Sequence, residues 1–309
     1  MLIVLTVALP VFALIATGIA VRRLGLLGEG ATLALNQFVV LLALPAVLLQ
    51  GMAKIAVSDL ADWRFLLAFL LPVLAGAGLV AALAARAGLP LANTTLRALA
   101  ATLSNTGFMG IPLCLMAFGP DALAPVVISV VLTTCVQFGG ALALVELATH
   151  AERGPRRALG IAARALARNP MLVAPFAGLA LAAAGLSLPV VADRFLTLLG
   201  AAATPCALVA IGLQLGEAGQ RFAPRIVAVL VAVKLLLQPA VAWLVAYRLL
   251  AMHPTWAAVA VIAAALPTGT TAFLLAGLHG REAATASGTV LVSTIASFVT
   301  LSVLLALLA

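Results

Sequence analysis

Charged residues are scarce in this chain of 309 residues, because Asp, Glu, Lys and Arg together make up only 8% of it. An ordinary soluble domain has roughly 25%. Hydrophobic residues make up 65% of the chain, and its mean hydropathy is +1.27. So few polar side chains cannot cover a water-facing surface, which excludes a soluble globular protein. The composition predicts an all-α polytopic membrane protein surrounded by the lipid bilayer.

Acidic residues are the scarcest charged type, nine against seventeen Lys and Arg, and the net charge is +8. A basic chain indicates nucleic acid only when Lys and Arg cluster on a solvated face. Here they fall in short gaps between apolar runs, so we expect no nucleic-acid partner. The three histidines lack metal-ligand spacing, and no glycine-rich phosphate loop is present. We therefore expect no enzyme: no catalytic residues, no metal and no cofactor.

Long apolar runs dominate the sequence instead. A helix that crosses about 30 Å of hydrocarbon, at about 1.5 Å per residue, needs about 20 apolar residues. Ten runs meet this test: Leu2–Val21, Ala31–Ala53, Phe65–Ala85, Ala98–Pro120, Ala122–Val145, Asn169–Ala192, Phe195–Gly216, Ile226–Tyr247, Thr255–Leu278 and Ala283–Ala309. Lys234 is the one charged residue inside them. We predict ten transmembrane helices.

The distribution of Lys and Arg predicts the orientation of these helices. If the chain starts outside, twelve arginines fall in the odd-numbered gaps, and only Lys54, Arg64, Arg194 and Arg248 fall on the opposite side. Positive residues accumulate on the cytoplasmic side. We therefore expect a multi-pass inner-membrane protein with both termini non-cytoplasmic, and a short basic cytoplasmic linker at residues 149–168.

The linker separates two groups of five spans that resemble each other at a shift of 160 residues. The matched residues are Pro10 with Pro170, Gly18 with Gly178, Gly25 with Gly185, Pro45 with Pro205, and Phe138 with Phe298. Because five is odd, the repeats 1–148 and 169–309 would have opposite orientations in the membrane. Such an inverted repeat is typical of secondary transporters, whose site lies at the midplane between the repeats.

The fourth and ninth spans are both interrupted by glycine and proline near the middle. The interruptions read Ser104-Asn105-Thr106-Gly107-Phe108-Met109-Gly110-Ile111-Pro112 and Leu266-Pro267-Thr268-Gly269-Thr270-Thr271. Unwound backbone at this depth is tolerated only inside protein or beside a cavity. Each break would leave a half-helix N-terminus with free N–H groups and partial positive charge. Together the two ends predict a site for a small anion.

Lys234 lies near mid-membrane, where an ionisable residue indicates a function. It would either attract the anion or neutralise carbonyl groups of the half-helices, and we favour the second role. No Asp or Glu lies deep inside a span, so transport should not require proton binding to a carboxylate. Sodium ligands from carbonyl groups and from Asn, Gln or Thr side chains are not excluded.

Three segments resemble the auxin efflux carrier family, which includes the plant PIN-FORMED carriers and bacterial carriers of malonate, malate and similar acids. They are Asn36–Val39 leading to Leu44-Pro45-Ala46, Asn105-Thr106-Gly107 leading to Gly110-Ile111-Pro112-Leu113, and Ala265–Gly269. The resemblance covers nearly the whole chain. It departs from the plant carriers in the short 149–168 linker and in the third span, which lacks their acidic and basic pair.

This resemblance implies a 5+5 inverted repeat in which the broken helices four and nine cross. Helices 1, 2, 6 and 7 would form a scaffold and homodimer interface, and helices 3–5 and 8–10 a transport domain that moves like an elevator. The family's crossover motif implies substrate contacts at Asn105, Ile111, Pro112, Pro267 and Thr268. To these the two breaks add Thr106, Gly110, Gly269 and Thr270, with Lys234, Pro45 and Pro205 in supporting roles.

The sequence as a whole therefore predicts a carrier of a small organic anion, such as a monocarboxylate, a dicarboxylate or an auxin-like acid. One alternative is a sodium-coupled symporter of the bile-acid-carrier type. Another is a membrane receptor or enzyme that uses the cavity without transport, although the tiny loops leave no signalling domain.

Overall fold

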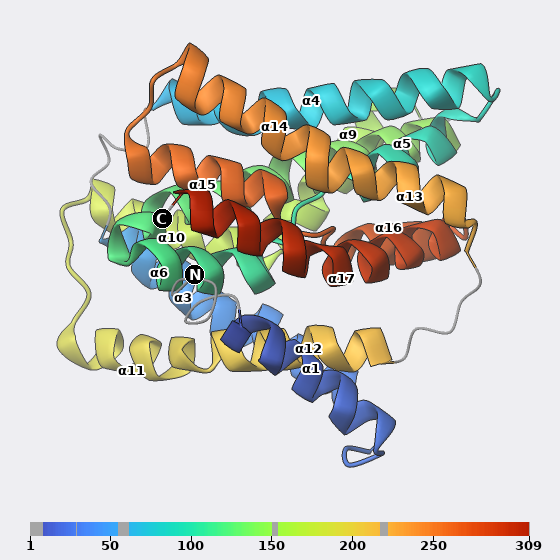
Figure 1. Ribbon diagram of the computed structural model, residues 1–309. Helices are drawn as coiled ribbons and strands as arrows, with labels where there is room; N and C mark the ends of the chain where they lie inside the picture. The colour runs from blue at the N-terminus through green and yellow to red at the C-terminus, as the bar shows by residue number, and fades with distance from the viewer. Residues whose placement is uncertain (1–8, 29, 55–61, 150–153, 217–221, 309) are drawn as a thin grey trace.

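The computed structural model describes residues 9–28, 30–54, 62–149, 154–216 and 222–308, and these ranges are helical without any strand (Figure 1). The first half contains α1 (Leu9–Arg23), α2 (Ala31–Phe38), α3 (Leu44–Ala53), α4 (Trp63–Arg86), α5 (Leu91–Thr102), α6 (Ile111–Phe118), α7 (Leu123–Leu132) and α8 (Gly139–Thr149). Helix α9 (Gly154–Ala167) leads to α10 (Pro170–Ala183), α11 (Val190–Ala201), α12 (Ala203–Gly216), α13 (Pro224–Ala232), α14 (Gln238–Trp243), α15 (Pro254–Ala265), α16 (Thr271–Leu278) and α17 (Ala283–Leu308). Shorter π-helical segments are η2 (Val39–Ala43), η4 (Thr106–Gly110), η6 (Thr133–Phe138), η8 (Val233–Leu237) and η9 (Leu244–Leu249), and η5 (Pro120–Ala122) is a 3-10 turn.

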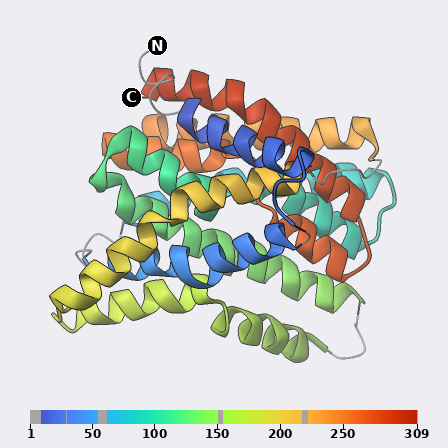
Figure 2. The same ribbon diagram turned by 90° about the horizontal axis from the view of Figure 1, so that it is seen from below.

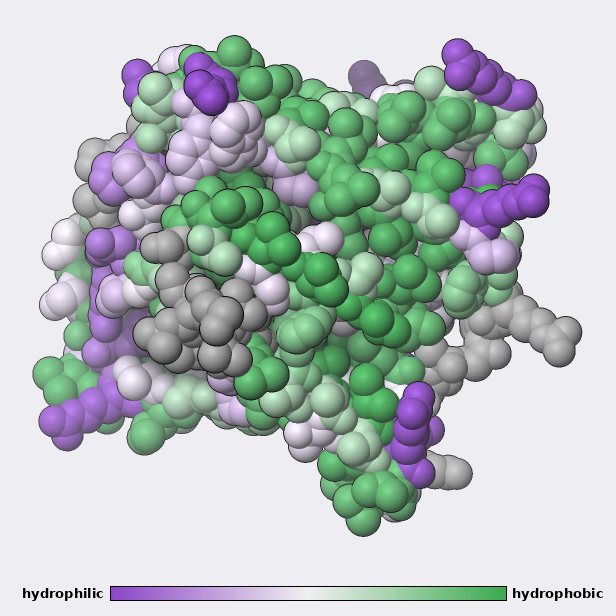
Figure 3. Space-filling view, in the orientation of Figure 1, coloured by the Kyte–Doolittle hydropathy of each residue, from purple (hydrophilic) through white to green (hydrophobic). Residues whose placement is uncertain are grey.

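Six continuous helices in the described ranges are long and apolar enough to cross a membrane. They are Ala31–Ala53, Trp63–Arg86, Pro120–Thr149, Val190–Gly216, Pro224–Leu249 and Ala283–Leu308. Each matches a predicted span within a few residues. On the face shown in Figure 3, hydrophobic side chains cover most of the middle, and hydrophilic ones gather toward the left and right edges. The protein is thus an all-helical membrane protein with several apolar spans.

The four remaining predicted spans take other forms, so a total of ten stays a prediction. Helix α1 has 15 described residues, and residues 1–8 of its span, like both chain ends, lie outside the described ranges. The fourth and ninth spans are broken. The sixth was predicted too long: α10 ends at Ala183, because Gly185 takes a left-handed φ of +66° and the next helix begins at Val190.

The linker is more ordered than a plain connection in its described part. From Gly154 it forms the helix α9, whose exposed arginines are Arg156, Arg157 and Arg164. Residues 150–153 lie outside the described ranges. Helix α9 meets α10 at an angle of 69°, so the chain turns sharply where the second half begins.

Two helix pairs approach each other to backbone contact, α1 with α12 and α3 with α10 (Figures 1 and 2). A Cβ on Gly18 would lie 2.2 Å from the carbonyl oxygen of Val209. A Cβ on Gly178 would lie 2.3 Å from the carbonyl oxygen of Leu49. Both partners are shifted by 160 residues, which is the register of the sequence repeat. The same close contact therefore occurs in both halves.

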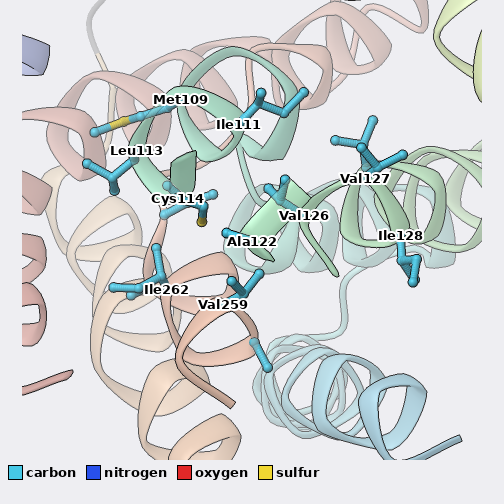
Figure 4. Close-up of a cluster of buried hydrophobic side chains, with 14 of the residues drawn as sticks. Met109, Ile111, Leu113, Cys114, Ala122, Val126, Val127, Ile128, Val259 and Ile262 are labelled. Carbon is cyan, nitrogen blue, oxygen red and sulfur yellow. The ribbon is translucent and has the colours of Figure 1, made fainter. Parts of the chain in front are cut away.

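The core beside these pairs is apolar and includes the second half of the broken fourth span. Met109, Ile111, Leu113 and Cys114 are fully or almost fully buried. Figure 4 shows them facing side chains of two neighbouring elements, among them Val126 of α7 and Val259 and Ile262 of α15. This packing fixes the position of the half-helix that follows the break.

A polar cluster joins the outer ends of the two broken spans. The Arg97 Nε of α5 lies 2.9 Å from a carboxylate oxygen of Glu282, and the Asn93 amide donates to the other oxygen at 3.0 Å. Arg281 in turn donates to Asn93. Glu282 has a φ of +54°, a conformation that costs free energy outside glycine. The cluster holds this turn after α16 against the start of α5.

We predict that Gly18→Val strongly destabilises the protein. The new side chain meets a backbone carbonyl of α12 that cannot move aside, so the cost should reach or exceed the roughly 1–3 kcal/mol of ordinary overpacking. Gly78→Val in α4 is the matched control, because no atom lies within 4 Å of its Cβ position. Thermal unfolding in detergent measures the difference, and equal melting temperatures for the two variants would contradict the backbone contact.

We also predict acid destabilisation through Glu282. Burial alone would raise the pKa of this carboxyl, but hydrogen bonds from Arg97 and Asn93 outweigh it and hold the pKa below its ordinary value of 4.5. A lowered folded pKa stabilises the protein above the unfolded pKa, and this contribution is lost as the pH falls below it. The gap in melting temperature between wild type and Glu282→Gln should therefore shrink from neutral pH toward about pH 3.5. Asp121→Asn, on the exposed η5 turn, is the control, and a pH-independent gap for Glu282→Gln would refute the assignment.

Candidate anion site at the helix crossover

Both broken spans leave helical geometry at a residue with extended backbone. Leu266 has a ψ of 148°, as expected for a residue that precedes proline. Leu103 has a ψ of 114° without a following proline. Pro112 lies nine residues later, at the start of α6, where its missing N–H costs little. The expectation that Gly110 and Pro112 interrupt the fourth span was thus wrong in position: the break lies at residues 103–105.

The two breaks cross and pair with each other. The Asn105 N–H donates to the Pro267 carbonyl at 2.9 Å, and the Gly269 N–H donates to the Leu103 carbonyl at 2.9 Å. Ser104 and Thr268 face each other as an antiparallel bridge. A shift of 164 residues converts one of these hydrogen bonds into the other. Backbone groups that the breaks release are thereby satisfied inside the protein, as a membrane interior demands.

Lys234 lies behind the crossover and is fully buried. Its Nζ donates to Ser104 Oγ at 3.0 Å, to Gln238 Oε1 at 2.7 Å and to the carbonyl oxygen of Ala264. That carbonyl belongs to the last turn of α15, the negative end of this half-helix. Of the two roles predicted for Lys234, its contacts match the neutralisation of half-helix carbonyls, and its side chain does not line the cavity in front.

A cavity of about 100 Å³ opens on the other side of the crossover. Its polar lining consists of Ser104, Asn105, Thr106, Thr133, Thr134, Asn169, Thr270 and Thr271. Phe108, Phe138 and Met171 contribute apolar surface. No acidic residue occurs among its lining residues, so nothing charged repels an anion there.

Two half-helices begin at this cavity. The segment from Thr106 to Phe118 and the helix α16 both start with residues that line it. Asn105 accepts hydrogen bonds from Met109 and Gly110 through its carbonyl, so the N–H groups of Thr106, Gly107 and Phe108 have no acceptor within their own helix. Free donors and the positive ends of two helix dipoles therefore face one small polar space, which suits a carboxylate.

The structure separates the predicted site residues into two groups. Asn105, Thr106, Gly269 and Thr270 line the cavity. Gly110, Ile111 and Pro112 are buried in the core beside it, and a Cβ on Gly110 would lie 2.8 Å from Leu266.

Four further predicted positions also lie outside the cavity lining. Thr268, next to Pro267 in the crossover, is fully buried, and its Oγ1 donates to the Ala100 carbonyl at 2.8 Å. Pro45 in α3 is half-buried, and Pro205 in α12 is exposed. These residues support or border the crossover rather than line its cavity.

Sequence reasoning missed the walls that other helices supply. Thr133 and Thr134 come from η6, and Asn169 and Met171 from the start of α10. Met171 packs so closely that a Cβ on Gly107 would lie 2.6 Å from its terminal methyl group. A pair of adjacent threonines inside an apolar span was the available signal. Within the described residues, no group of three or more His, Cys, Asp or Glu side chains is placed to hold a metal.

Comparison with known proteins agrees on one family. A family model described as membrane transport protein matches residues 3–305. A protein of Rhizobium meliloti named "Putative malonate transporter" is 33% identical over 308 residues, which covers 97% of this chain and 94% of the relative. An "Uncharacterized transporter" of Methanothermobacter thermautotrophicus is 27% identical over 295 residues, or 95% and 94% of the two chains.

The geometry around Lys234 predicts a stability role that can be measured. Lys234→Met leaves Gln238, Ser104 and the Ala264 carbonyl without their buried donor, so the free energy of unfolding should fall by about 3 kcal/mol. Lys54→Met is the control, because Lys54 is more than half exposed and a surface ion pair is worth at most about 1 kcal/mol. Denaturation in detergent gives both values. If Lys234→Met weakened ligand binding and left stability unchanged, Lys234 would belong to the ligand contacts.

Proposed function

The chain belongs to the membrane transport protein family, the family of the auxin efflux carriers, and on that premise we propose that it carries a small organic anion held in the crossover cavity. It is a transporter rather than an enzyme. The observation that carries the proposal is the convergence of two half-helix N-termini on a polar cavity without acidic residues. A carboxylate there would accept hydrogen bonds from backbone N–H groups and hydroxyls.

Size favours a short acid as the substrate. A cavity of about 100 Å³ holds a molecule of a few non-hydrogen atoms, such as a three-carbon or four-carbon carboxylate. The name of the Rhizobium relative mentions malonate, a dicarboxylate of that size. One carboxylate would bind the N–H groups near Thr106 and Gly107, and the second the start of α16 near Thr270.

The same proposal includes ten helices in two inverted repeats, 1–148 and 169–309. It is supported by the Gly18 and Gly178 contacts, which match at a shift of 160 residues. The reciprocal hydrogen bonds of the crossover, which match at a shift of 164 residues, support it as well. Two shifts are needed because the register differs by four residues between the scaffold and the crossover.

Alternating access then follows an elevator-like path. Helices 1, 2, 6 and 7, which include the close pairs α1–α12 and α3–α10, form the scaffold and the homodimer interface. The remaining six form the transport domain. The cavity lies between these units, because Asn169 and Met171 belong to the scaffold side and the crossover to the other. Movement of the crossover past α10 would carry the anion across.

For orientation we propose an inner-membrane protein with the 149–168 linker in the cytoplasm and both termini on the other side. The arginine bias between the two sides supports it. The runner-up function is a sodium-coupled symporter of the bile-acid-carrier type, whose ligands would come from carbonyl groups and hydroxyls such as those of Thr133 and Thr134.

Proteoliposomes loaded with the purified protein provide the test of transport. Labelled malonate should enter in a saturable manner, without a requirement for sodium. Flux that depends on sodium would favour the symporter, and binding without flux would favour a receptor. Amide substitution of the acidic residues should leave flux largely intact, because none of them lines the cavity.

The cavity itself is tested by Asn105→Ala. Loss of one neutral hydrogen bond costs on the order of 1–1.5 kcal/mol, so affinity for the anion should fall about tenfold. Asn36→Ala in α2 is the control, because Asn36 is a half-buried amide outside the cavity. Calorimetry with malonate measures both. Unchanged affinity in Asn105→Ala and in Thr134→Val would move the site away from the crossover.

A further inference from the structure

A second hollow, unrelated to the anion cavity, lies where the end of α4 meets the start of α13. Its volume is about 260 Å³. Val80, Leu83, Val229 and Leu230 represent its lining, which is aliphatic apart from two arginines, Arg97 and Arg225. We call this hollow the α4–α13 groove. It combines a greasy floor with two cations and contains no acidic lining residue.

The two arginines differ in how they are held. Arg97 forms an ion pair with Glu282 at 2.9 Å, which fixes its guanidinium and cancels its charge. Arg225 is exposed and forms no ion pair within the described residues. The groove therefore carries one uncompensated positive charge at its rim, beside a guanidinium that is already positioned.

The depth of the groove matches the boundary between headgroups and hydrocarbon. Its lining on the α4 side runs from Val80 to Ala87, next to the last residue of this 24-residue apolar helix. At about 1.5 Å per residue, this stretch covers about 10 Å from the helix end toward the bilayer centre. Leu83 and Val229 are 40% and 43% exposed, so the groove opens sideways, toward the position of lipid chains.

We propose that the α4–α13 groove binds one anionic phospholipid, with its phosphate against Arg225 and Arg97 and an acyl chain along the aliphatic floor. Charge complementarity selects the headgroup, because basic pockets between transmembrane helices attract acidic lipids. The aliphatic floor favours a lipid over a soluble anion, since a free phosphate would leave that floor exposed to water.

This lipid would touch the helix that carries the crossover. Arg97 lies in α5, six residues before the break that begins at Leu103, and its partner Glu282 follows α16. The bound phosphate would therefore sit beside the polar cluster that joins both broken spans. The acyl chain would bridge α4 and α13, so binding should stabilise the fold.

Native mass spectrometry of the detergent-purified full chain, titrated with dioleoylphosphatidylglycerol, tests the proposal. Arg225→Gln should lower the affinity about fivefold, the effect of one arginine near a charged membrane surface. Arg86→Gln is the matched control, because Arg86 is exposed at the end of α4 and does not line the groove. Val229→Trp fills the groove without a change of charge and should also weaken binding.

The headgroup and the acyl chains are tested separately with dioleoylphosphatidylcholine and with glycerol phosphate. Tighter binding of phosphatidylglycerol than of either probe, together with its loss in Arg225→Gln and Val229→Trp, supports the proposal. Equal binding of the two lipids, equal effects of Arg225→Gln and Arg86→Gln, or binding of glycerol phosphate as tightly as the lipid would overturn it. Melting temperatures of all variants, measured without lipid, verify that each one is folded.

Discussion

Backbone hydrogen bonding in the absence of water is the constraint on which this structure depends. Two helices are broken deep inside an apolar protein, and every released N–H and carbonyl group there needs a partner. The crossing of the breaks satisfies four of these groups through two reciprocal hydrogen bonds. Lys234 satisfies another at the Ala264 carbonyl. Because these groups are occupied, the remaining free N–H groups, those at the start of the half-helices, are available to a ligand.

The close helix pairs explain how such a crossover can be held between two units. At Gly18 and Gly178 the helices meet at backbone distance, which leaves little freedom for α1 to slide on α12 or α3 on α10. The cavity wall at Met171 behaves differently, because a long flexible side chain rests on a glycine. Rigid contacts within the scaffold and a yielding contact at the cavity are the physical basis for the proposed division into two units.

Local properties of the sequence were enough for the apolar helices and for one of the two breaks. Hydropathy located the six continuous spans because burial in lipid depends on the composition of each segment alone. Pro267 located the second break through its effect on Leu266. The first break was misplaced, because Pro112 begins a helix rather than ending one. Thr134 resembled an ordinary membrane threonine bonded to the preceding turn, as it is, and only the packing of η6 against the crossover places it at the cavity. Asn169 reaches it through a contact that no local pattern encodes.

The contacts of Lys234 also constrain how the protein is made. A ribosome delivers Ser104 130 residues before Lys234, and Ala264 only 30 residues after it. When the lysine first enters the membrane, Gln238 of its own helix and Ser104 of the first half are its available partners. The Ala264 carbonyl arrives with the ninth span. Completion of the crossover is therefore a late, post-insertion event, and until then a lysine with an incomplete set of partners is a natural point for membrane quality control to inspect.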